Sequence, residues 1–324
     1  MRRTAFGMLL LAVPVCLLLG VTVFCGSASV GFSDVWDALL FRGKPFVEDV
    51  VWLIRVPKAC AAFLSGMSLA VSGLVLQSVF KNPLAGPFVL GVSSGANLGV
   101  ALVLLAGFGK GFLGVVPAAA VGAFLVVLSV LFASRFVTHS VSLLIVGLMV
   151  GYFVDAVIAF LMSASSAESL RGFVTWGLGS FSRVPLSSVG SFALVTALGI
   201  LPCLLCTRYL NAAQVGDTFA ETLGIRVKLS RMTALFGASL LAAGSTVYCG
   251  PVGFLGLASP HIAFGIFRTT NHRILFPASA LVGANLALLS GLVSGIPLSS
   301  VTSLVGAPIV LWIFLRSGRG ERNA

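Results

Sequence analysis

Residues 208–231 read RYLNAAQVGDTFAETLGIRVKLSR and form the longest polar interruption in the second half of the chain. They lie between two apolar runs, each about long enough to cross a lipid bilayer. Gly216 and Gly224 bracket a segment in which Asp217 could accept the first free N–H groups of a helix and Gly224 could end it. We therefore expect a short helix here, outside the membrane. From this pattern alone, a docking element for a partner and an ordinary connecting loop are equally good interpretations.

The composition indicates an integral membrane protein. Of the 324 residues, 58% are hydrophobic and 9% are charged, and the mean hydropathy is +1.10, whereas soluble domains carry about 25% charged residues. The apolar residues come in long continuous runs rather than alternating, which favours helices over a barrel. We expect an all-α protein with one polytopic transmembrane domain over residues 1–324. The net charge of +11 does not indicate a nucleic-acid partner, because the basic residues lie mostly in loops.

Ten apolar runs are long enough, or nearly so, to cross the membrane. Because ten is even, both termini and the polar segment 208–231 would share one side of the membrane. That side would hold most of the 20 basic residues, including Arg135, while Lys110 would lie on the other. The excess of positive charge predicts that the termini and residues 208–231 are cytoplasmic. The runs cover about residues 4–25, 59–80, 88–106, 112–134, 141–162, 184–206, 232–249, 254–267, 274–294 and 298–316.

Six cysteines give no pattern typical of disulfides or of a metal site, and we expect no metal ligands in this chain. Cys203 and Cys206 have the spacing of a redox pair, but no soluble βαβ pattern surrounds them. We interpret both as small apolar residues of a membrane helix.

Several motifs follow one another from residue 55 to the end of the chain. Together they closely resemble, in order and spacing, the permease subunits of ABC importers for iron–siderophore complexes, haem and cobalamin, the type II importer or FecCD family. The motifs are RVPK at 55–58, KNPLAGP at 81–87, LGVSSGA at 90–96, WGLGS at 176–180, GDTFAETLG at 216–224, GPVGFLGLASPH at 250–261, NHR at 271–273 and LVGAP at 304–308.

The resemblance implies the type II importer permease fold of ten helices, in the bacterial cytoplasmic (inner) membrane. It also implies a second permease copy, most simply as a homodimer, two cytoplasmic ATPase subunits and an extracytoplasmic substrate-binding protein. The chain has no phosphate-binding loop sequence, so we expect no enzyme activity and no cofactor in it, with ATP and Mg bound by the partner ATPase. Within 208–231, six residues match the family's ATPase-coupling helix: Gly216, Asp217, Ala220, Glu221, Leu223 and Gly224.

Arg55 and Lys58 precede the second apolar run, on the predicted outer side. Basic residues there could simply anchor the helix at the lipid interface. In the family, such residues meet acidic residues of the binding protein, and we favour that docking role. A second basic docking position near the C-terminus is missing, because residues 292–298 are short and carry Gly295 where relatives have an acidic residue.

The resemblance also places several residues along the translocation pathway: Gln77, Asn82, Pro83, Ser93, Gly95, Asn97 and Asp155. Asp155 differs from the family pattern, because it is an acidic residue well inside a predicted span. Such a residue usually faces a partner or a water-filled cavity. Contact with the substrate and a protonated structural role are equally good interpretations. His261 follows Pro260 without a second ligand nearby, and we interpret it as a structural histidine.

Two other classes of function are weaker. An ion-coupled secondary transporter would need several carboxylates inside the membrane, and Asp155 alone is a poor supply. A membrane-embedded enzyme would need a nucleophile with a base, or a ligand cluster, and no such group is present. For the importer, an iron chelate (siderophore or haem) is the preferred substrate because such members dominate the family, and cobalamin is the alternative.

Overall fold

The computed structural model describes residues 2–26, 30–108, 114–133, 136, 140–293 and 296–321. Lys110, Arg135 and Gly295, which entered the sequence-based predictions, lie outside these ranges. Within them the regular structure is entirely helical, as the continuous apolar runs predicted.

Seven helical segments are long and apolar enough to cross a membrane, and three shorter apolar helices accompany them in the described part of the chain. Together they correspond to the ten predicted spans. The long ones are α1 (Arg2–Phe24), the continuous segment Pro45–Phe80, α6 (Val115–Ala133), α7 (Ser140–Ser163), α9 (Leu186–Leu205), α12 (Val227–Cys249) and α14 (His272–Leu292). The shorter ones are α5 (Val92–Leu104), α13 (Leu255–Phe267) and the apolar part of α15 (Leu298–Glu321).

Helix α4 (Val56–Phe80) lies at the centre of the helix assembly and packs against α9, α12, α13 and α14. Small residues allow these close contacts: a Cβ added at Gly66 would lie 2.3 Å from the Gly283 carbonyl oxygen, and one at Gly73 only 1.7 Å from that of Gly256. Hydroxyl groups tie α4 to α12, since Ser72 donates to the Ala238 carbonyl at 2.8 Å. The central helix is therefore held by close backbone approach and by interhelical hydrogen bonds.

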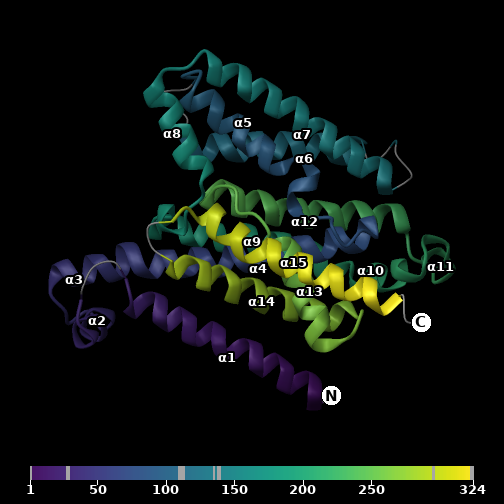
Figure 1. Cartoon of the computed structure of the whole chain (residues 1–324), viewed down its shortest axis with the longest axis horizontal. Helices are drawn as coiled ribbons and strands as arrows, with labels where there is room; N and C mark the ends of the chain where they lie inside the picture. The colour runs from purple at the N-terminus through teal and green to yellow at the C-terminus, as the bar shows by residue number, and fades with distance from the viewer. Residues whose placement is uncertain are drawn as a thin grey trace.

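Helices α5, α6 and α7 form a layer beside α12 (Figure 1). Gly95 and Gly99, which have the spacing of a close-packing pair, meet α6: a Cβ on either would lie 2.5 Å or less from a carbonyl oxygen, that of Gly122 or Ala118. The absence of a side chain at these two positions therefore allows the close approach of α5 and α6.

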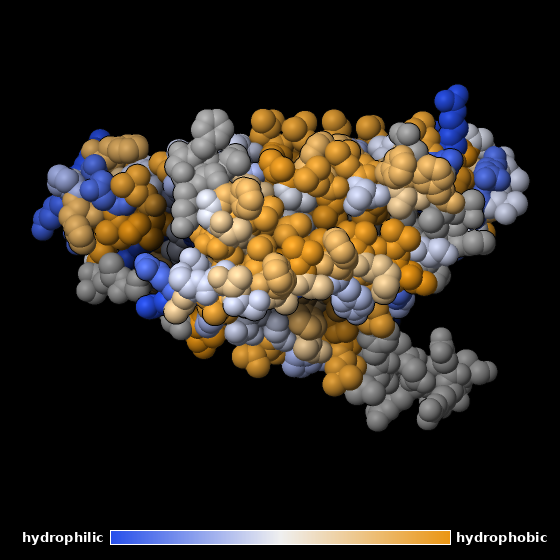
Figure 2. All heavy atoms as spheres, turned by 90° about the horizontal axis from the view of Figure 1, so that it is seen from above, coloured by the Kyte–Doolittle hydropathy of each residue, from blue (hydrophilic) through white to orange (hydrophobic). Residues whose placement is uncertain are grey.

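The two ends of the molecule carry different short elements. Figure 1 shows α2 (Phe32–Leu39) and α3 (Pro45–Asp49) at one end, and α11 (Asp217–Thr222), the start of α1 and the end of α15 at the other. Figure 2 shows apolar side chains over the middle of one face, with the most hydrophilic ones gathered towards the two ends. This distribution fits a bilayer around the middle of the molecule.

The remaining short elements are the π-helical turn η1 (Val50–Arg55), the 3₁₀ turns η2 (Pro87–Leu90) and η3 (Phe181–Arg183), and helices α8 (Ala167–Gly177) and α10 (Thr207–Val215).

Candidate functional site: the coupling segment and the outer cleft

The polar stretch between α9 and α12 folds into α10 and α11, followed by a turn at Gly224. We call residues 207–224 the coupling segment, after the role that the family resemblance implies for it. The expected short helix is present and lies between Gly216 and Gly224. Gly224 has φ of +74°, and its N–H donates to the Glu221 carbonyl at 2.9 Å, while Ile225 N–H donates to that of Ala220 at 3.2 Å. These bonds satisfy the last carbonyls of α11, and the left-handed backbone suits glycine.

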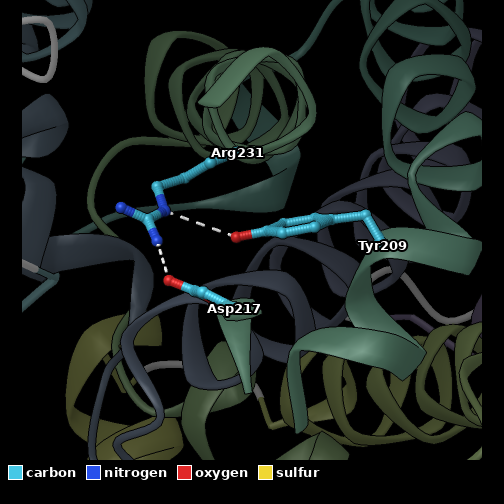
Figure 3. Close-up of polar contacts among 3 residues, drawn as sticks. All are labelled: Tyr209, Asp217 and Arg231. Atoms are coloured by element: carbon cyan, nitrogen blue, oxygen red, sulfur yellow. Dashed lines mark hydrogen bonds and ion pairs between the residues drawn. The ribbon is translucent and has the colours of Figure 1, made fainter. Parts of the chain in front are cut away.

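Asp217 does not cap α11, contrary to the sequence-based expectation. Its carboxylate instead forms an ion pair with Arg231 on α12. The guanidinium of Arg231 also donates through Nε to the Tyr209 hydroxyl on α10, at 3.4 Å (Figure 3). Burial raises the pKa of the Tyr209 phenol, so the hydroxyl stays protonated. These three side chains, which we call the clamp, fasten α10, α11 and the start of α12 to one another.

The other face of α11 is apolar and exposed. Ala220 is fully buried against the protein, whereas Phe219 is 45% exposed and Leu223 is 58% exposed. Both line a cleft of about 530 Å³, whose lining also includes Arg208 and Arg273. An apolar surface with basic side chains beside it, on a helix that the clamp fastens to its neighbours, is suited to bind another protein.

Arg55, which the family pattern predicts to be a docking residue, is buried in the single chain. The side chain is 4% exposed, and Nη1 donates to the carbonyl oxygens of Val23, at 3.1 Å, and Phe24, at 2.8 Å. Those carbonyls end α1 and have no partner within that helix. The Arg55 guanidinium therefore caps the C-terminal end of α1, where its positive charge also interacts favourably with the helix dipole.

Lys58 does reach an open surface. It lines a cleft of about 680 Å³ with residues 178–183, 290, 291, 293 and 296–298. Arg183 lies in the same cleft and donates to the carbonyl oxygens of Trp176 and Thr175, both at 3.1 Å. We call this the outer cleft, because it lies at the predicted extracytoplasmic ends of α4, α14 and α15.

The expected pathway residues at the end of α4 lie close together. Gln77 donates to the Leu257 carbonyl at 3.2 Å, and Asn82 accepts the Leu84 N–H at 2.9 Å in the turn that follows. The Pro83 carbonyl accepts a 2.8 Å bond from His261 Nε2, which fits the structural role expected for that histidine.

The expected pathway residues on α5 and α7 lie in different surroundings. Ser93 is buried and bonds to Thr246 at 3.2 Å, while Gly95 is a packing contact with α6. Asn97 has a buried amide oxygen that lacks a hydrogen-bond partner among the described residues. Asp155 lies on α7 and is exposed in the single chain. Of these four residues Asp155 is exposed and Asn97 is partly exposed, while Ser93 and Gly95 are buried.

One buried polar centre was not singled out from the sequence. His272, at the start of α14, is 1% exposed and bonds to both α10 and α4. It occurs in the NHR motif at 271–273, but its partners are 61 and 194 residues away along the chain, and short-range patterns do not indicate such contacts.

The profile of the FecCD transport family matches residues 10–316. The chain belongs to this family. The FecCD permease described here is 34% identical to the uncharacterized ABC transporter permease protein YvrB of Bacillus subtilis, over 95% of this chain and 92% of that protein. It is also 34% identical to the vitamin B12 import system permease protein BtuC of Salmonella typhi, over 98% of this chain and 97% of that one.

A solved structure assigned to a metal-chelate type ABC transporter, in an inward-facing conformation, has the same fold. Its TM-score is 0.85 at 26% identity, with 95% of this chain and 98% of that chain covered. The FecCD permease is thus a multi-pass membrane protein with the fold of type II ABC importer permeases, and the family predicted from the motifs is confirmed.

Proposed function

We propose that two copies of this permease form the pathway by which an ATP-driven importer moves a metal chelate across the bacterial inner membrane. Two ATPase subunits, which bind ATP and Mg, would sit against the coupling segment on the cytoplasmic side. An extracytoplasmic binding protein would deliver the chelate at the opposite end. Family membership supports the class of importer, and the family implies an ATPase and a binding protein as partners.

The observation that carries this proposal is the exposed apolar face of α11. Phe219 and Leu223 lie outside the bulk of the helix assembly, on a helix that the clamp holds in place. Exposed apolar side chains on a fixed helix at a polar end favour a protein partner over a lipid or solvent environment. A connecting loop would need neither the apolar face nor the clamp.

At the other end, the outer cleft is our candidate surface for the binding protein. Lys58 supplies a positive charge that an acidic side chain of the binding protein could approach. Arg55 remains a predicted docking residue only from the family pattern, and its burial favours the structural role described above.

For the cargo, an iron chelate (siderophore or haem) is our first candidate and cobalamin the second. One relative named above, BtuC, is a vitamin B12 import permease. This relative supports cobalamin as the alternative cargo. We also place Asp155 on the pathway, because an exposed carboxylate within a span is costly in lipid and would instead face water between the two copies.

The test is reconstitution of the permease with its cognate ATPase and binding protein in vesicles. We expect the ATPase to co-purify and uptake to require ATP, with no uptake from an ion gradient alone. Offering a ferric siderophore, haem and cobalamin separately to the purified binding protein would identify the cargo by affinity. Uptake driven by an ion gradient without ATPase would contradict the proposal.

A further inference from the structure

A buried polar network joins the coupling segment to the central helix α4. At its middle is His272, the first residue of α14. Asn211 on α10 accepts the His272 backbone N–H at 2.9 Å with Oδ1, and the same oxygen lies 2.8 Å from Nδ1 of the ring. On the opposite side of the ring, Nε2 lies 2.7 Å from the Ser78 hydroxyl, in the last turn of α4.

The His272 ring has partners from α10 on one side and from α4 on the other. Asn211 is oriented by its Nδ2, which donates to Asn271 Oδ1 at 3.2 Å, so Oδ1 faces the histidine. The amide nitrogen of Gln214, also on α10, lies 3.2 Å from Nδ1. On the α4 side the Ser78 hydroxyl donates to the Leu74 carbonyl at 2.9 Å, and its oxygen faces Nε2. The ring thus connects α10 to α4.

Burial makes these bonds difficult to replace. His272 is 1% exposed, and the Phe276 ring lies 5.8 Å away, centroid to centroid. Water cannot readily take the place of a lost partner at such a site, so breaking either bond leaves an unpaired polar group inside the protein.

The coupling segment would move as one body, because the clamp fastens α11 to α10 and to α12. A second contact supports the same connection, since Gln214 on α10 donates to the Thr270 carbonyl at 2.7 Å, just before α14. A displacement of α11 would therefore be carried to Asn211, and through His272 to Ser78 and the neighbouring pathway residue Gln77.

We propose that His272 is a positioning residue that transmits movement of the coupling segment to α4 and so to the inner end of the pathway. This inference rests on the proposed function, since it needs an ATPase that moves the coupling segment. It assigns a role to a side chain that lies away from the exposed face of α11.

Two variants remove the connection on different sides of the ring. His272→Phe keeps an aromatic ring of similar size and removes the ring's hydrogen bonds to α10 and α4. Ser78→Ala removes the bond between the ring and α4, together with the bond that Ser78 makes to Leu74 within its own helix. Ser259→Ala is the matched control, because that hydroxyl is also buried but donates within its own helix, to the Leu255 carbonyl at 2.6 Å. His272→Gln retains a donor and an acceptor and should restore part of the function.

The readout is the movement of the chain just after α4, in the permease–ATPase complex. A cysteine replacing the exposed Leu84, as the only reactive thiol, is labelled with a water-soluble maleimide without nucleotide and after trapping with ATP and vanadate. We expect trapping to change the labelling rate of the parent protein. His272→Phe and Ser78→Ala should reduce that change by about tenfold, within the range by which single residues modulate coupling. Ser259→Ala should leave it intact.

Nucleotide trapping and ATPase co-purification are measured on the same samples. If trapping is normal and both variants retain the full labelling response, α4 moves without His272 and the inference is wrong. Loss of the response in Ser259→Ala as well would also overturn it, because the effect would then be one of general packing. Failure of the parent protein to bind the ATPase or to trap nucleotide would instead contradict the proposed function.

Discussion

At the scale of single residues, Leu223 and Arg55 differ in solvent exposure, although the family pattern predicts that both contact partner proteins. Leu223 is 58% exposed although it is apolar, and Arg55 is 4% exposed although it is charged. Each departs from the usual distribution of its residue type, and each departure has a physical reason. Leu223 lies where a partner could cover it, and Arg55 lies where free helix carbonyls need a donor.

We predict that Leu223→Asp weakens ATPase binding. A carboxylate at the centre of an apolar contact would be desolvated without a partner, and residues at such positions contribute roughly 2 kcal/mol or more to binding. The measurement is ATPase co-purification and ATP-driven uptake at equal expression, with Leu223→Met as the apolar control. Unchanged binding by the aspartate variant would show that α11 is not the coupling element.

We predict that Arg55→Ala destabilises the end of α1 and leaves binding-protein affinity unchanged. Two hydrogen bonds from a charged donor are lost, at a cost of roughly 1–3 kcal/mol for the unsatisfied group. Hydrogen exchange of residues 20–26 and thermal unfolding should both report it. For Lys58→Ala we expect the opposite result: normal thermal stability, but association with the binding protein that is slower and depends less on salt. If Arg55→Ala slowed association at normal stability, the docking role expected from the sequence would be correct.

At the scale of elements, the sequence predicted what local patterns determine. The apolar runs located the spans, and the two glycines located α11. The clamp could not be predicted, because Asp217 and Arg231 are 14 residues apart and Tyr209 and Arg231 are 22 apart. For Asp217 the local pattern predicted a helix cap. The carboxylate instead pairs with the guanidinium of Arg231, because a charged guanidinium attracts a carboxylate more strongly than free backbone N–H groups do. Long-range packing likewise determines the contacts of Arg55 and His272.

The turn that ends α11 gives a prediction at this scale. Gly224 has φ of +74° and nothing within 4 Å of an added Cβ, so Gly224→Val would strain the backbone without a steric clash, by roughly 1–2 kcal/mol. We expect normal membrane insertion but weaker ATPase association or uncoupled ATP hydrolysis. Gly190→Ala is the control, because Gly190 lies within helix α9, away from the coupling segment, and also has open space around it. Equal coupling in both variants would exclude a role for this turn.

At the scale of the whole molecule, the arrangement of helices fits the predicted parity of ten spans. The start of α1, the end of α15 and α11 lie at one end (Figure 1). Which end faces the cytoplasm follows only from the distribution of basic residues. The substrate is not apparent at this scale or from the sequence, because the cargo's chemistry would be recognised first by the binding protein.

We predict that Glu221 is cytoplasmic and Glu168, at the start of α8, extracytoplasmic. Both side chains are exposed, so a cysteine at either position, without other reactive cysteines, should be accessible to an impermeant maleimide. In intact cells only the Glu168→Cys protein should be labelled, and after permeabilisation both should be. Labelling of both in intact cells would rule out the ten-span arrangement.

The contacts of α1 have a consequence for how the protein is made. This helix is translated first, yet it packs mainly against α14, which comes much later along the chain. Arg55 follows soon enough to bond to its last carbonyls early, whereas Asn285, which donates to the Leu11 carbonyl at 3.0 Å, and Phe267, which lies against Gly7, come late. During synthesis α1 therefore lacks the last of these partners until about nine-tenths of the chain has left the ribosome. A ribosome stalled before residue 267 would hold a chain whose first span still lacks its main packing partner.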